Sequence, residues 1–173
     1  MAQTTESIDD ELARRHRMAA MTVVSMLGLT LLLVALAFAG VLDFPARPAD
    51  PFLKGALSIG IVLFGFGAVT LRRTRFASAR LQDIAALRGA SGLLATLQNT
   101  TMLVALAGGA IALMGFVITM NSGDEFDMVR LGLIAVAVLL YAYPRRSAWQ
   151  RVVDSTRTMN SELQQPPAKG TVA

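Results

Sequence analysis

The sequence predicts an all-α, polytopic membrane protein: a bundle of four transmembrane helices with one amphipathic helix on the cytoplasmic surface. Two features predict this class. Hydrophobic residues make up 54% of the 173 residues and charged residues only 16%, against about a quarter in ordinary soluble domains. The hydrophobic residues are also gathered in four long blocks, which is the pattern of segments that cross a bilayer rather than of amphipathic soluble helices.

The first span follows a polar segment, residues 1–17, that we expect on the cytoplasmic side. The uncharged block at 18–42 is longer than the roughly 20 residues needed to cross a hydrocarbon core. Ala37, Phe38 and Ala39 have the small-x-small form of a cleavage site, so a cleaved signal peptide is the alternative. The block is longer than a typical signal core and follows acidic residues, and both features favour an uncleaved anchor.

The second span is expected at 53–71, where the sequence is short and rich in glycine, with Lys54 reaching the headgroups from its outer end. The cytoplasmic loop at 72–96 follows. Apolar residues recur on one helical face of its first part, which predicts a helix at 74–88 lying on the membrane surface. Gly89, Ser91 and Gly92 are expected to separate this helix from the next span.

The third span is expected at 97–120 and the fourth at 126–143. The fourth is short, so it needs Phe126, Met128 and Val129 at its outer end to reach the length of a bilayer crossing. Residues 144–173 are predicted to form a cytoplasmic tail. Its end has too few apolar side chains to build a core, so we expect that end to be disordered.

The positions of the basic residues predict that both termini are cytoplasmic. Thirteen of the sixteen Lys and Arg residues fall in the N-terminal segment, the 72–96 loop or the tail, and basic residues mark the cytoplasmic side. Trp149 is expected at the membrane interface on that side, beside Tyr141 and Tyr143. The basic residues expected to contact anionic lipid or an acidic partner there are Arg72, Arg73, Arg75, Arg80, Arg88, Arg145 and Arg146.

Small residues form a seam along the third span at alternating spacings of four and three residues. The seam consists of Thr101, Ala105, Gly108, Ala112, Gly115 and Thr119. The second span has a shorter one, made of Ala56, Gly60 and Gly67. Small side chains let helix backbones approach closely in lipid. We therefore expect the second and third spans to form the tightest pair, with contact between two copies of the protein as the alternative.

The residue types that catalysis or cofactor binding needs are not grouped in the sequence. There is no cysteine and His16 is the only histidine. No charged residue lies in the core of a predicted span, although ion and proton pathways usually need one. Asp124, Glu125 and Asp127 could hold a hard cation weakly, but the charge asymmetry of the chain already accounts for them. We predict a protein that is not an enzyme, that has no cofactor or metal, and that has no nucleic-acid partner.

Residues 105–115 resemble the second helix of the proteolipid c or K subunits of rotary ATP synthases. The ion-binding carboxylate of that family would fall at Gly109, so the resemblance implies no ion site here. The whole four-span pattern, together with the segment from Tyr143 to Trp149, is similar to small uncharacterised four-span bacterial membrane proteins. This similarity implies a place in the bacterial inner membrane and supplies no activity.

Two classes of function remain. The favoured one is a non-enzymatic accessory, assembly or scaffold subunit of a membrane complex, in contact with the lipid bilayer and with another membrane protein or a second copy of itself. The alternative is a minimal transporter or channel for a neutral or apolar solute. It requires the hydroxyl groups of the spans to converge on a cavity, and these belong to Ser25, Thr30, Ser58, Thr70 and Thr119.

Overall fold

The computed structural model describes residues 2–39, 50–75, 78–151 and 154, with their side chains except at 2–8, 75 and 78–90. The described part is helical and has no strand. Its helices are α1 (Ala2–Phe38), α2 (Pro51–Arg75), α3 (Ser78–Ser122) and α4 (Glu125–Ala142), followed by a short helical segment at 146–151. All four labelled helices are long and apolar enough to cross a membrane, which confirms the predicted all-α class and the number of candidate spans.

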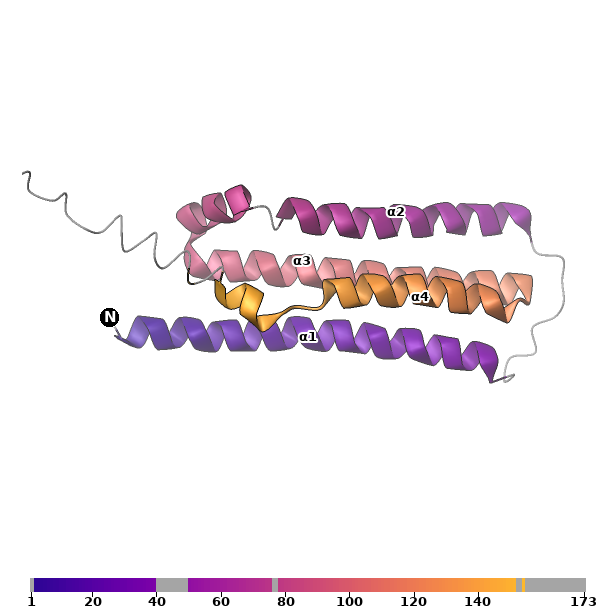
Figure 1. The fold of residues 1–173 in the computed structure, drawn as a ribbon, viewed down its shortest axis with the longest axis horizontal. Helices are drawn as coiled ribbons and strands as arrows, with labels where there is room; N and C mark the ends of the chain where they lie inside the picture. The colour runs from indigo at the N-terminus through magenta and orange to yellow at the C-terminus, as the bar shows by residue number, and fades with distance from the viewer. Residues whose placement is uncertain (1, 40–49, 76–77, 152–153, 155–173) are drawn as a thin grey trace, which may run out of the picture.

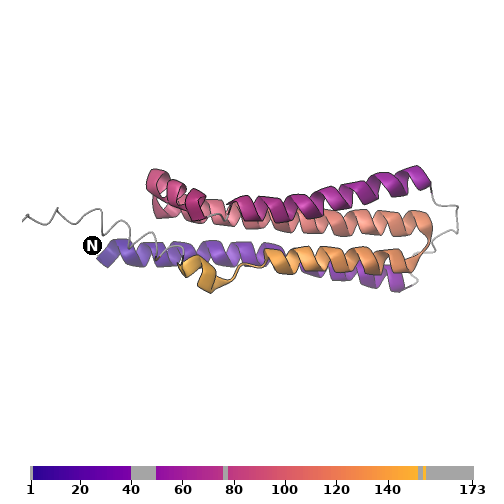
Figure 2. The ribbon, with the colours of Figure 1, turned by 45° about the horizontal axis from the view of Figure 1, so that its top comes forward.

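α3 differs from the prediction in its length. It is one continuous helix through residues 89–92, where we expected a break, so that expectation is wrong. Figures 1 and 2 show that its first turns lie at an angle to the rest, so the chain changes direction without losing its helix. Leu93, Leu94 and Leu97 are fully buried, and burial among apolar side chains favours a helix because it leaves no water to bond a broken backbone.

The surface position of the segment at 74–88 stays a prediction. Its backbone from residue 78 belongs to α3, but the side chains of Arg75, Arg80 and Arg88 lie outside the described residues. The structure does not test the alternative of a cleaved signal peptide. The predicted disorder of the tail also stays a prediction, because residues 155–173 lie outside the described residues.

The turn between α3 and α4 forms where the sequence places polar residues. Gly123 adopts a positive φ of 67°, and its N–H donates to the carbonyl of Thr119 at 2.8 Å, a common way for a helix to end at glycine. Asp124 then caps α4, because its carboxylate accepts from the N–H of Phe126 at 3.0 Å. This tight turn makes α3 and α4 antiparallel neighbours.

α3 is the central helix of the bundle. It packs against α1, α2 and α4 to about the same extent, so α2 and α3 are not distinguished as the tightest pair. α4 also packs against α1, whereas α2 touches α4 only slightly and makes almost no described contact with α1. Figure 1 shows α1 and α2 on opposite sides of α3 and α4. The bundle is therefore open between α1 and α2.

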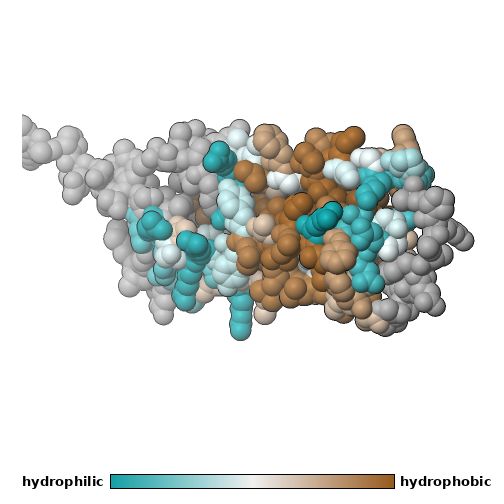
Figure 3. All heavy atoms as spheres, turned by 45° about the vertical axis from the view of Figure 1, so that its right-hand side comes forward, coloured by the Kyte–Doolittle hydropathy of each residue, from teal (hydrophilic) through white to brown (hydrophobic). Residues whose placement is uncertain are grey.

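The apolar surface lies along the middle of the bundle. Figure 3 shows this on one face, with hydrophobic side chains gathered between two more hydrophilic ends. The start of α1, the end of α2, the start of α3 and the helical segment at 146–151 lie at one end, which we call the inner end after the predicted orientation. The other, where Lys54 and the α3–α4 turn lie, is the outer end.

Candidate functional site

The seam of small residues on α3 is buried along its whole length. Its two glycines face α4 rather than α2, although α2 packs on α3 as extensively as α1 and α4 do. A Cβ atom placed on Gly108 would lie 2.8 Å from the side chain of Leu139, and one on Gly115 would lie 2.8 Å from Leu131 Cβ, both on α4. The seam therefore seats α4 against α3, and periodic spacing alone cannot show which neighbour a seam meets.

Gly109 of α3, which is not part of the predicted seam, lies where α1 packs against α3. A Cβ on Gly109 would lie 2.7 Å from the sulfur of Met26. Gly132 on α4 similarly faces Val34 of α1 at 3.0 Å. Glycine thus sets the close approach of α1 to both α3 and α4. The sequence carries Gly109 beside Gly108, but a helix turns by about 100° per residue, so adjacent glycines face different neighbours.

The predicted seam on α2 is mostly exposed. Ala56 and Gly67 are open, and only Gly60 approaches a neighbour: a Cβ placed on it would lie 3.2 Å from the sulfur of Met114. α2 packs on α3 instead through Ile61 and Ala68, which are buried. The predicted small-residue seam of α2 therefore lies at the edge of the α2–α3 contact and not inside it.

α3 has neighbours on three sides and is open on the fourth. Its exposed apolar side chains form one stripe that faces the gap between α1 and α2. We call this the open stripe, and it consists of Leu103, Leu106, Leu113, Val117 and Met120. Apolar side chains facing lipid are ordinary in a membrane protein, but a stripe on the central helix, flanked by two others, offers a partner three helices to contact at once.

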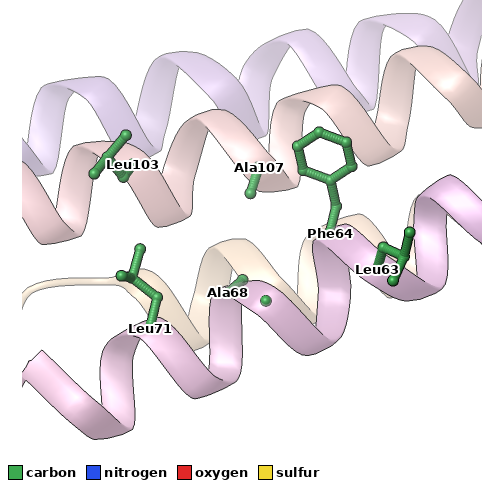
Figure 4. A pocket seen from close by; sticks show the side chains of 7 residues that line it. Leu63, Phe64, Ala68, Leu71, Leu103 and Ala107 are labelled. Carbon is green, nitrogen blue, oxygen red and sulfur yellow. The ribbon is translucent and has the colours of Figure 1, made fainter.

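An apolar groove runs along the α2 side of the open stripe. Figure 4 shows side chains of both helices facing this space. Its volume is about 310 Å³, and it is lined by Leu63, Phe64, Gly67, Ala68, Leu71, Leu103 and Ala107. The lining has no charged or hydroxyl side chain, so the groove suits an apolar ligand.

Trp149 lies inside the protein and not at the lipid interface. Its side chain is only 2% exposed, and its ring meets that of His16 edge to face at 5.7 Å between centroids. His16 Nε2 also lies 2.9 Å from the carbonyl oxygen of Pro144. Trp149 and His16 join the segment after α4 to α1, and this correction removes Trp149 from the predicted lipid-contact residues.

The arginines of the inner end have different surroundings. Arg73, Arg145 and Arg146 are exposed and remain available to lipid or a partner. The guanidinium of Arg72 instead lies 4.4 Å from the centre of the Tyr141 ring on α4, a cation–π contact. Arg72 therefore links α2 to α4 within the protein.

A second charged link joins α2 and α4 at the outer end. Lys54 Nζ lies 2.6 Å from Asp127 Oδ2, and Ser122 donates to the same oxygen at 3.1 Å. Lys54 thus pairs with a carboxylate instead of only snorkelling to the headgroups. Asp127 bonds to Lys54 and Asp124 caps α4, so the carboxylates of the acidic turn do not point to a common cation position. Among the described residues, no group of three or more His, Cys, Asp or Glu could hold a metal.

The hydroxyl groups of the spans do not converge on a common cavity. Thr30 donates to the Met26 carbonyl, Thr70 to Phe66 and Thr119 to Gly115. Each bond stays on its own helix, and none of these hydroxyls lines the apolar groove. The groove between α2 and α3 is therefore not a hydroxyl-lined path.

The most extensive open feature of α3 is therefore an apolar surface, formed by the open stripe and the groove beside it. A scan against models of known protein families, a search of the curated proteins and a search of the solved structures found no match to this chain.

Proposed function

We propose that this protein is a non-enzymatic accessory or assembly subunit of a bacterial inner-membrane complex, which receives a transmembrane helix of another membrane protein on the open stripe of α3. The observation that carries the proposal is the open fourth side of the central helix. Leu106, Leu113 and Val117 are exposed there, whereas the small residues Ala105, Gly108, Ala112 and Gly115 of the same helix are buried.

Packing supports a protein partner at this position. Half of the α3 span is buried within the chain, against 11% of the α2 span, so α3 is the helix most specialised for contact with other helices. Without a hydrophobic driving force inside lipid, helices associate by close packing. A helix seated on the open stripe would lie between α1 and α2 and complete the ring of neighbours around α3.

The charges support an orientation with both termini in the cytoplasm. Arg14, Arg17 and Arg73 are exposed at the inner end, and Arg145 and Arg146 follow α4 at the same end. Basic residues of this kind are retained on the cytoplasmic side. The same surface would contact anionic lipid headgroups, so the bilayer is the second proposed partner.

A transporter for a neutral solute is less well supported. It would need polar groups along a path, and the hydroxyls of Thr30, Thr70 and Thr119 are bonded back to their own helices. The groove that does exist is apolar and lies on the side of the bundle. Both features favour the subunit over a solute pathway.

The test is site-specific photo-crosslinking in native membranes of cells that express the full chain. A photoreactive residue replaces Leu113 on the open stripe. The matched control replaces Leu133, which is exposed on α4 and faces away from the stripe. We expect Leu113 to yield one protein adduct of defined mass, identified by mass spectrometry, and Leu133 to yield none.

Two results would count against this role. Adducts with lipid alone at both positions would show that the stripe is ordinary lipid-facing surface. An adduct at twice the mass of the chain would identify a second copy as the occupant in place of another protein.

A further inference from the structure

Two arginines from different parts of the chain meet at the inner end: Arg72 near the end of α2 and Arg145 just after α4. The guanidinium of Arg72 lies 4.4 Å from the centre of the Tyr141 ring, so it is held against α4. Arg145 is close enough to Arg72 for the two positive charges to repel each other. We call these two residues the inner arginine pair.

The backbone of Arg145 is fixed although its side chain is exposed. Its carbonyl accepts from the N–H groups of Ala148 at 3.0 Å and of Trp149 at 3.3 Å, and the side chain of Trp149 is buried. The Arg145 side chain takes part in no ion pair between described residues. Two like charges held near each other raise the energy of the fold, and an anion placed beside both lowers it.

The surface on the membrane side of the inner arginine pair is apolar. Residues three, four or seven positions apart share a helix face. On α2, Val69 stands three residues before Arg72 and is exposed. On α4, Ala137 and Ile134 stand four and seven residues before Tyr141 and are also exposed. A ligand that matches both surfaces needs an anionic group at one end and a hydrocarbon part at the other.

We propose that the inner arginine pair binds the phosphate of one anionic phospholipid, whose acyl chains lie along the exposed apolar side chains of α2 and α4. Arginine suits this role because its planar guanidinium donates two parallel hydrogen bonds to a phosphate. A soluble acidic peptide would match the charges but not the apolar surface beside them. The inference rests on the proposed contact of the inner end with anionic lipid and narrows it to one site, and it is independent of the subunit role.

Arg146 provides a matched control for Arg145. Both side chains are exposed, but Arg146 borders a polar hollow against α1, together with Asp9 and Leu12. Arg145→Gln and Arg146→Gln therefore remove the same charge from adjacent residues, and only the first variant alters the inner arginine pair.

The experiment is native mass spectrometry of the full chain, purified in mild detergent and mixed with phosphatidylglycerol or phosphatidylcholine that carry identical acyl chains. We expect the wild type and Arg146→Gln to retain one phosphatidylglycerol in preference to phosphatidylcholine, and Arg145→Gln to lower this preference about fivefold. Thermal unfolding in detergent checks that both variants are folded. An equal drop in both variants, or no preference in the wild type, would overturn the proposal.

A second pair of variants keeps every charge and alters only the support of Arg72. Tyr141→Leu removes the ring that holds the guanidinium, whereas Tyr141→Phe retains a ring for the same cation–π contact. We expect Tyr141→Leu to lower the preference for phosphatidylglycerol roughly twofold or more, and Tyr141→Phe to keep it. Full retention by Tyr141→Leu would show that charge alone attracts the lipid and would refute a defined site.

Photo-crosslinking separates this proposal from the subunit role. A photoreactive residue in place of Tyr143, which is exposed two residues before Arg145, should yield lipid adducts that Arg145→Gln reduces. A protein adduct there that Arg145→Gln abolishes, with equal retention of both lipids, would show that an acidic protein binds the pair and that the lipid proposal is wrong. The adduct at Leu113 should be the same in the wild type and in Arg145→Gln, and its absence from both would count against the subunit role alone.

Discussion

α2 and α3 are both rich in glycine, yet the glycines of α3 are covered more closely than those of α2. Cβ atoms on Gly108, Gly109 and Gly115 of α3 would all come within 3 Å of a neighbouring side chain, whereas those on Gly55 and Gly67 of α2 would meet nothing within 4 Å. On α3 the missing side chain is what allows a neighbouring helix to approach. On α2 it leaves open surface. A run of small residues is therefore a packing signal only when its register meets another helix.

The two helices are also attached to α4 in different ways. α3 holds α4 by glycine-to-leucine packing along the span. α2 reaches α4 mainly at its ends, through the Lys54–Asp127 ion pair and through Arg72 over Tyr141. The middle of α2 therefore makes little contact with α4 and packs on α3 instead, through Ile61 and Ala68.

The largest effect is expected for Gly115→Ala. The new Cβ would lie 2.8 Å from Leu131 Cβ, an atom that moves only if the α4 backbone moves. Overpacking of this kind lowers the free energy of unfolding by about 1–3 kcal/mol. Denaturation in SDS, followed by the fluorescence of the single tryptophan, Trp149, measures it. Unchanged stability would mean that α3 and α4 are farther apart than described.

A smaller loss is expected when the outer-end ion pair is broken. Asp127→Asn removes a charge whose side chain is 12% exposed, but its partner Lys54 is 43% exposed, so we expect a coupling of about 1 kcal/mol. A double-mutant cycle with Lys54→Met isolates this value. A coupling near zero would show that α2 does not depend on this link.

Gly109→Ala should be milder than Gly115→Ala although its new Cβ would meet a neighbour at an equally short distance. The atom met at 2.7 Å is the sulfur of Met26, near the end of a flexible side chain that can turn aside. We expect a loss below about 1 kcal/mol in the same SDS titration. If this variant is the less stable of the two, rigidity of the neighbouring atom is not what determines the cost.

Gly67→Ala should have the smallest effect and the opposite sign. The site is open, and alanine favours a helix over glycine by up to about 1 kcal/mol. The variant should therefore unfold at the same or a slightly higher SDS fraction than wild type. A clear loss of stability would mean that a neighbour covers Gly67 and that the contrast between the two helices is smaller than described.

The sequence was sufficient to predict the four helices, because uncharged blocks of bilayer length and polar turns such as Gly123–Asp124 are local signals. The sequence was not sufficient to predict which helices pack against each other. Gly108 and Gly109 differ by one residue yet face α4 and α1. Trp149 is typical of a membrane interface, but the close approach of His16, far earlier in the chain, buries it.

The open stripe could not be predicted for the same reason. Leu106 and Leu113 are indistinguishable from buried leucines in the sequence. They are exposed only because α1 and α2 do not close over α3, which is a property of the whole arrangement. The apolar groove likewise depends on the spacing of two helices and has no signature in either one.

The separation of α1 from α2 also constrains how the bundle assembles. In membranes, helices form first and associate afterwards, and α1 and α2, which are consecutive in the chain, make almost no described contact with each other. Both find their main partner in α3, or, for α1, in α3 and α4. A chain cut before α3 would therefore lack the helix on which both α1 and α2 pack, and the described contacts of α2 would be almost entirely lost.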